Sequence, residues 1–264
     1  MTDFETVDLR IEGQFAHVTL NRPDVKNAIN RQLTQDLLAI FTQLKDNHTV
    51  KGIVLSGAGG TFCAGGDLNE MRSAFMDSDT SNDSAFEDVL VAVNTAPQVV
   101  ITKVEGAAMG GGFGLVCVSD IAIASTTAKM GLPEVRLGIA PAFISPYVIQ
   151  RIGLSRSREL MLTGRRFNGT EAKTYGIVNE CVEPDELDTR VNEIIAEVRK
   201  CSPNALRATK ALIFEVMGKP MAETVEYRAN LLSELRRSDD AQEGIMAFMQ
   251  KRPAKWAVTD EETE

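Results

Sequence analysis

The stretch Glu105-Gly-Ala-Ala-Met-Gly-Gly-Gly-Phe-Gly114 decides the expected fold. A strand-like run at 99–104 leads into it, and small apolar residues at 115–117 follow it. Glycine at 110–112 removes the side chains where a helix should begin, so backbone N–H groups stay exposed at the positive end of the helix dipole. Such a place binds an anion, or an oxygen that becomes negative during a reaction. Tight packing or a strained turn would explain the same glycines.

Length and composition indicate a globular chain with a sizeable core. The chain has 264 residues, of which 44% are hydrophobic and 25% are charged. These values are typical of one large domain, or of a domain with an appendage. The net charge of −9 disfavours non-specific binding of nucleic acid.

Cysteine usage and the N-terminus indicate a reducing compartment. The cysteines, at positions 63, 117, 181 and 201, have no CxxC spacing, and two of them lie in apolar or small-residue runs that are typical of reduced core thiols. The N-terminal residues are acidic, and no run approaches a membrane span. We therefore expect a cytoplasmic protein without a membrane partner. Because histidine occurs only at positions 17 and 48, no histidine-rich metal site is expected.

Strand and helix patterns alternate through about residue 182. Asn30 is placed to cap a helix over 31–46, and Asp67 with Glu70 resembles a capping box for a helix from Leu68. The other expected elements are a hairpin (5–11 and 14–20), strands at 51–56, 121–124 and 177–182, and helices at 85–96, 146–152, 155–162 and 170–176.

A helical tail is expected beyond this region, over 185–201, 203–217, 220–237 and 239–250. We therefore divide the chain into a core of repeated ββα units (1–184) and a C-terminal helical region (185–264). The apolar faces of the tail helices need partners, either the core or another subunit.

A second glycine loop, with the sequence Phe62-Cys-Ala-Gly-Gly-Asp67, also follows a strand and precedes a helix. The N–H groups of Gly66 and Gly111 are candidates to converge on one oxygen, as a thioester carbonyl needs when it becomes an enolate. Dinucleotide binding is not indicated, because in a G-x-G-x-x-G motif that begins at Gly110 the sixth position is Leu115 and not glycine.

Glu134 is the candidate acid–base residue. It lies between apolar neighbours in Leu132-Pro-Glu-Val135, where partial desolvation would favour proton transfer. A surface glutamate, or one in a salt bridge with a residue such as Arg136, is the simpler interpretation of an isolated glutamate.

Several motifs in order resemble the enoyl-CoA hydratase/isomerase (crotonase) family over roughly residues 8–256. They are Asn21-Arg-Pro23 with Asn27-Ala28, 62–67, Gly110-Gly-Gly112 with Asp120, Gly131-Leu-Pro-Glu-Val-Arg-Leu-Gly138, Leu162-Thr-Gly164 with Ala172 and Gly176-Ile-Val178, and Ala247-Phe-x-x-Lys-Arg252.

The resemblance implies an α/β crotonase-like spiral of ββα units, with a helical tail that forms trimers or hexamers. It implies an acyl-CoA substrate, whose coenzyme A is part of the substrate, and no separate cofactor. The enolate would be held by the N–H groups of Gly66 and Gly111, with Glu134 as acid and base. The implied CoA-binding residues are Lys26, Ala28, Ala64, Gly65, Asp67 and Leu68, completed by Phe248 and Lys251 of a neighbouring subunit.

Gly114 departs from the family pattern, because typical two-glutamate hydratases have a glutamate at this position. A single glutamate also suits a Δ3,Δ2-enoyl-CoA isomerase, which remains the alternative. The segments 112–120, 137–147, 201–204 and 208–211 resemble a narrower group that hydrates 3-methylglutaconyl-CoA or isohexenylglutaconyl-CoA. We therefore expect a hydratase of a 3-branched enoyl-CoA, with open space beside Gly114 for the acyl group.

Three further sets of residues are weaker candidates. A distal carboxylate would meet Arg72 or Arg136. A non-catalytic CoA- or RNA-binding protein is the alternative of another class, suggested by the basic residues Arg199, Lys200, Arg207 and Lys210. Candidates for the acyl wall are Phe75, Met76, Phe86, Phe143 and Tyr147.

Overall fold

The structure is a computed structural model that describes residues 4–74 and 85–258. Its main sheet has the strand order β1-β2-β3-β4-β6-β9, in which only β1 and β2 pair antiparallel. The strands are β1 (Val7–Glu12), β2 (Phe15–Leu20), β3 (Gly52–Gly57), β4 (Val99–Val104), β6 (Ile121–Ser125) and β9 (Glu180–Val182). This arrangement agrees with the α/β class that was predicted.

A small second sheet was not predicted. It contains β5 (Ala107–Met109), β7 (Lys129–Gly131) and β8 (Arg166–Asn168), in the order β5-β7-β8. Each strand has three residues, which is too short for an alternating pattern to be seen in the sequence. This sheet is important for the site, because β5 leads into the glycines and β7 leads into Glu134.

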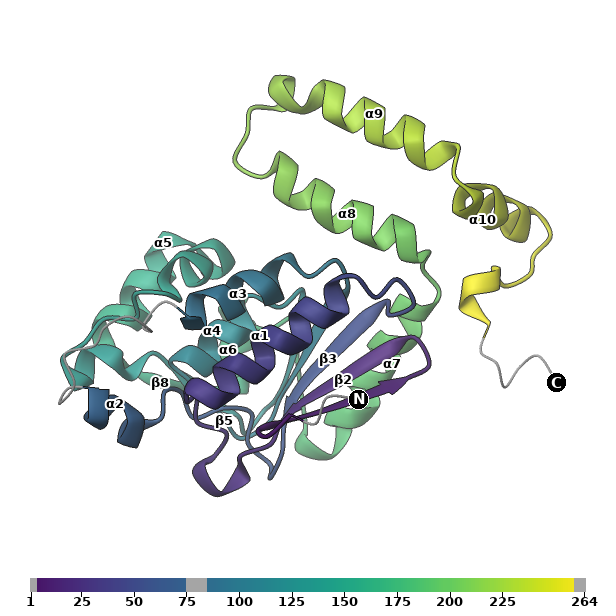
Figure 1. Ribbon diagram of the computed structural model, residues 1–264. Coiled ribbons are helices and arrows are strands. Elements are labelled where there is room, and N and C mark those ends of the chain that lie inside the picture. The colour runs from purple at the N-terminus through teal and green to yellow at the C-terminus, as the bar shows by residue number, and fades with distance from the viewer. Residues whose placement is uncertain (1–3, 75–84, 259–264) are drawn as a thin grey trace.

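Helices cover both faces of the main sheet (Figure 1). On one face, α7 (Leu187–Arg199) buries Val191, Ile195 and Val198 against Ile101 and its neighbours. The larger core lies on the other face, beneath α1 (Arg31–Lys45), α3 (Ala85–Thr95) and α4 (Gly111–Cys117).

The expected helix boundaries agree with the structure at several points. Asn30 caps α1 by accepting a hydrogen bond from Leu33 N–H at 2.9 Å, and α2 (Leu68–Ala74) begins at Leu68. Asp67 accepts from Asn69 N–H, but Glu70 accepts from Arg31 N–H at 2.8 Å and does not complete a capping box. The short helix expected at 170–176 is α6 (Gly169–Thr174).

The two helices expected at 146–152 and 155–162 form one element, α5 (Ser145–Thr163), which is broken at Gly153. Gly153 has φ 74° and ψ 166°, outside the helical region. The predicted break between the two helices is therefore confirmed, although no loop separates the two halves of α5.

The tail helices α8 (Pro203–Val216), α9 (Val225–Arg236) and α10 (Asp239–Met249) lie beyond one end of the main sheet (Figure 1). Many of their apolar side chains are exposed, among them Leu232, Ile245 and Phe248. No helix in the described ranges is both long and apolar enough to cross a membrane.

Candidate active site

The two glycine loops are joined by a ladder of backbone hydrogen bonds. Cys63 N–H donates to Ala107 O at 2.8 Å, and Met109 N–H donates to Cys63 O at 3.0 Å. Gly65 lies so close to Met109 that a Cβ at position 65 would be 2.9 Å from its carbonyl oxygen. The ladder therefore brings the segments that end at Gly66 and Gly111 side by side.

Gly66 and Gly111 both leave their N–H groups without an intramolecular acceptor among the described residues. Around Gly66, the bridge to Ile29 uses the carbonyl of Gly65 and the N–H of Asp67 instead. Gly111 is the first residue of α4, where the preceding turn supplies no acceptor. Both glycines line one cavity of about 630 Å³.

Glu134 lines the same cavity from the first turn of the 3-10 helix η2 (Pro133–Leu137). Its segment is held to the glycine loop, because Gly110 N–H donates to Gly131 O at 3.0 Å. Its Oε2 atom is buried and has no hydrogen-bond partner among the described residues. Desolvation raises the pKa of this carboxyl above its ordinary value. The alternative in which Glu134 pairs with Arg136 is wrong, because Arg136 instead donates to Thr163 O.

The predicted CoA segments are partly in the cavity wall. Ala64, Gly65, Asp67 and Leu68 line it, and Asp67 is held by Arg22 at 3.1 Å. Lys26 and Ala28 do not line it. The backbone of Lys26 supports the wall, because Lys26 O accepts from Ala64 N–H, whereas the Ala28 side chain is buried.

Phe248 and Lys251 are on and just after α10, outside the cavity of their own chain. The side chain of Phe248 is 86% exposed. A contribution of these residues to the CoA site of a neighbouring copy stays a prediction.

The expectation of open space beside Gly114 is wrong. Gly114 is buried and does not line the cavity. A Cβ at this position would overlap Cγ2 of Ile144 and lie 3.5 Å from Cδ2 of Leu90. Ile144, which does line the cavity, therefore occupies the space into which a glutamate side chain at position 114 would extend.

Of the acyl-wall candidates, Phe86 and Phe143 line the cavity, whereas Tyr147 packs against the main core. Phe75 and Met76 lie outside the described residues. Neither Arg72 nor Arg136 lines the cavity, so the structure does not support either as the partner of an acyl carboxylate. The wall residues that were missed include Ile29, Arg31, Glu70, Met71, Leu137 and Arg166.

The basic residues on the tail are engaged within the chain. Lys210 is buried and paired with Asp120 at 2.6 Å, and Arg207 donates to Asn47 O at 2.7 Å. Lys200 pairs with Glu197. Lys210 and Arg207 are therefore held by the core, and the carboxylate of Glu197 offsets the charge of Lys200, which does not favour a basic face for RNA.

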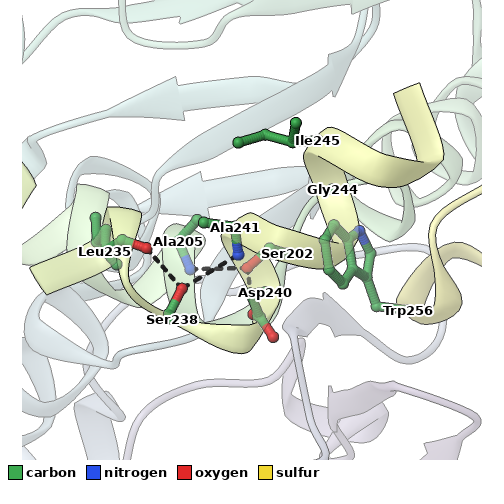
Figure 2. Close-up of a pocket in the computed structure, with 9 residues that line it drawn as sticks. All are labelled: Ser202, Ala205, Leu235, Ser238, Asp240, Ala241, Gly244, Ile245 and Trp256. Atoms are coloured by element: carbon green, nitrogen blue, oxygen red, sulfur yellow. Dashed lines mark hydrogen bonds between the residues drawn. The ribbon is translucent and has the colours of Figure 1, made fainter. Parts of the chain in front are cut away.

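A second, smaller cavity of about 280 Å³ lies where α8, α9 and α10 meet (Figure 2). Its hydroxyl groups are already used: Ser202 and Ser238 cap α8 and α10, and Ser202 also bonds Asp240. Apolar groups make up most of the remaining wall, so the tail cavity lacks the convergent polar groups of a catalytic site.

Two free backbone donors and one desolvated carboxylate in a single cavity are typical of enzymes that stabilise an enolate. A profile of the enoyl-CoA hydratase/isomerase family matches residues 10–259. The chain therefore belongs to the enoyl-CoA hydratase/isomerase family.

Similarity to individual proteins supports this assignment. A crystal structure of an enoyl-CoA hydratase/isomerase from Marinobacter aquaeolei is 43% identical, with a TM-score of 0.92, over 96% of this chain and 99% of that one. The structure of Pseudomonas aeruginosa AtuE is 40% identical, with a TM-score of 0.94, over 96% of this chain and 100% of that one. The probable enoyl-CoA hydratase echA8 of Mycobacterium bovis is 32% identical over 251 residues, which are 94% of this chain and 96% of that protein.

Proposed function

We propose that this protein adds water across the 2,3 double bond of a 3-branched, glutaconyl-type enoyl-CoA. The observation that carries the proposal is Oε2 of the Glu134 carboxylate, which is buried without a hydrogen-bond partner among the described residues, in the cavity that Gly66 and Gly111 also line. A carboxylate with a raised pKa is a suitable base for water.

In the proposed reaction, Glu134 takes a proton from water while the water oxygen bonds to C3. The electron pair of the double bond moves onto the thioester oxygen, and the N–H groups of Gly66 and Gly111 stabilise the enolate. A proton then reaches C2, from Glu134 or from the added water, as the thioester carbonyl re-forms. Loss of one such N–H donor typically costs about 3–4 kcal/mol of transition-state stabilisation.

A Δ3,Δ2-enoyl-CoA isomerase is the second candidate. Ile144 fills the place of a second carboxylate with an apolar side chain, which leaves fewer groups to orient water. In that reaction Glu134 would remove a proton from C2 and return it at C4, and the same two N–H groups would stabilise the intermediate dienolate.

Products formed in H₂¹⁸O distinguish the two reactions. The protein is incubated with 3-methylglutaconyl-CoA and with trans-3-hexenoyl-CoA, and the thioesters are identified by mass spectrometry. Hydration predicts ¹⁸O in a 3-hydroxyacyl product of the first substrate. Isomerised hexenoyl-CoA, with no ¹⁸O incorporated into either substrate, would instead establish the isomerase.

A further inference from the structure

Arg166 lines the cavity that holds Glu134. It is the first residue of β8 and pairs with Gly131, the last residue of β7. Gly131 precedes Glu134 by three residues and accepts the hydrogen bond from Gly110 N–H. The Arg166 side chain lines the same cavity as Gly111 and Glu134.

The guanidinium of Arg166 has no ion pair or hydrogen bond within the described part of the chain, and the residue is exposed. Arg165 differs sharply, since it binds Glu159, Glu171 and Tyr175. A guanidinium carries five N–H donors in a planar fork that matches a carboxylate. Arg166 therefore offers an unused anion-binding group to the cavity.

The rest of the wall near Glu134 is mostly apolar, with Leu137, Ile139, Phe143 and Ile144 among its members. Moving an acyl carboxylate from water into such surroundings would be unfavourable unless a cation compensated its charge. The other arginine in the wall, Arg31, begins α1 beside Glu70 and the 64–68 segment, on the side predicted for CoA.

We propose that Arg166 recognises a carboxylate at the distal end of the acyl group and so selects dicarboxylic acyl thioesters over plain ones. This inference rests on the proposed glutaconyl-type substrate. It assigns to Arg166 the role for which Arg72 and Arg136 were considered from the sequence.

The experiment measures binding by calorimetry, with two saturated thioesters that cannot be hydrated. Glutaryl-CoA and pentanoyl-CoA have acyl chains of equal length and differ only in the terminal carboxylate. Arg166→Leu should weaken glutaryl-CoA binding roughly tenfold or more, because a charge-assisted pair is lost, and leave pentanoyl-CoA nearly unchanged. Arg166→Lys should retain part of the preference, because it keeps the charge without the fork.

Arg158→Leu is the matched control. Arg158 is also exposed and without a hydrogen bond or ion pair in the described ranges, but it does not line the cavity. The Arg158→Leu variant should bind both thioesters with the same affinity as the unaltered protein. Equal weakening of both thioesters by Arg166→Leu, or no weakening of either, would overturn the proposal.

Binding and turnover separate this inference from the proposed function. If the unaltered protein prefers glutaryl-CoA through Arg166 but produces no hydrated product, hydration fails and the role of Arg166 stands. If it hydrates methylglutaconyl-CoA while Arg166→Leu retains the preference for glutaryl-CoA, only the role of Arg166 fails.

Discussion

Gly110 and the carboxylate of Glu134 are packed against each other: a Cβ at position 110 would lie 3.0 Å from Oε1 of Glu134. Gly110 also has φ 50° and ψ −118°, a backbone conformation that residues other than glycine rarely adopt. The first glycine of the triplet thus leaves room for the Glu134 carboxylate, while the second supplies an N–H group to the cavity.

Gly110→Ala should therefore impair both stability and turnover. The unfavourable φ should cost about 1–3 kcal/mol of unfolding free energy. Displacement of the Glu134 carboxylate should lower kcat by up to about 100-fold, because small errors in position are costly in catalysis. Urea unfolding and steady-state kinetics measure the two effects.

Gly176→Ala is the control for this variant. Gly176 has φ 75°, and a Cβ there would meet nothing within 4 Å. It should lose about 1–2 kcal/mol through backbone strain alone and keep its kcat. An equal fall of kcat in both variants would show that strain, and not contact with Glu134, is responsible.

Glu134→Gln should remove most turnover and preserve thioester binding. An amide cannot accept the proton from water, and loss of a general base typically lowers the rate about 100- to 10,000-fold. Dissociation constants for a saturated acyl-CoA should change little, because the amide keeps the shape of the side chain. Near-full activity of Glu134→Gln would refute the role given to this residue.

The raised pKa of Glu134 determines the pH dependence. The ionised form is the active base, so kcat/KM should fall as pH decreases through a pKa above the ordinary glutamate value. Because the folded state binds this proton more tightly than the unfolded state, ionisation at neutral pH destabilises the fold. Glu134→Gln should consequently be more stable than the unaltered protein near pH 7, with the difference vanishing in acid. An acid limb at the pKa of a free carboxyl would contradict this prediction.

The local features of the site could be read from the sequence because they depend on neighbouring residues. The glycines at 110–112, the Asn30 cap and the start of α2 follow from turn and capping chemistry within a few residues. The pairing of Gly66 with Gly111 was expected because each glycine follows a strand and precedes a helix, and the resemblance to a family implied the same pair.

The remaining features depend on contacts between distant segments. Glu70 binds the N–H of Arg31, 39 positions away, although its spacing from Asp67 is that of a capping box. Ile144 fills the space beside Gly114 from the N-terminus of α5. Arg166 reaches the cavity through β8, a strand too short to predict.

The contact between Gly114 and Ile144 predicts that the missing glutamate cannot simply be restored. Gly114→Ala should destabilise the protein by about 1–3 kcal/mol, because the added methyl overlaps Ile144. Ile144→Ala alone should cost about 2–5 kcal/mol through the cavity that it leaves. The double variant should lose less unfolding free energy than the two single variants lose together, and the difference, which is the coupling energy, should be about 0.5–3 kcal/mol. Additive losses in urea unfolding would show that the two residues do not compete for this space.

The pair Lys210–Asp120 should anchor α8 to the main sheet. Lys210 Nζ lies 2.6 Å from Asp120 Oδ2 and 3.0 Å from Gln98 O, and Asp120 Oδ2 also accepts from Val100 N–H. Burial lowers the pKa of Lys210, whereas the charge and the hydrogen bond of Asp120 raise it. The charged form of the amine therefore depends on this carboxylate.

Lys210→Met should therefore leave the Asp120 carboxylate without its cation and cost about 3–5 kcal/mol of unfolding free energy. The double variant Lys210→Met/Asp120→Asn should recover part of the loss, because no charge then remains unpaired. Lys200→Met, which removes an exposed pair with Glu197, is the control and should change stability by no more than about 1 kcal/mol. If Lys210→Met were no more destabilising than this control, the Lys210–Asp120 pair would not anchor α8, and its other contacts, such as the hydrogen bond from Arg207 to Asn47 O, would have to hold it.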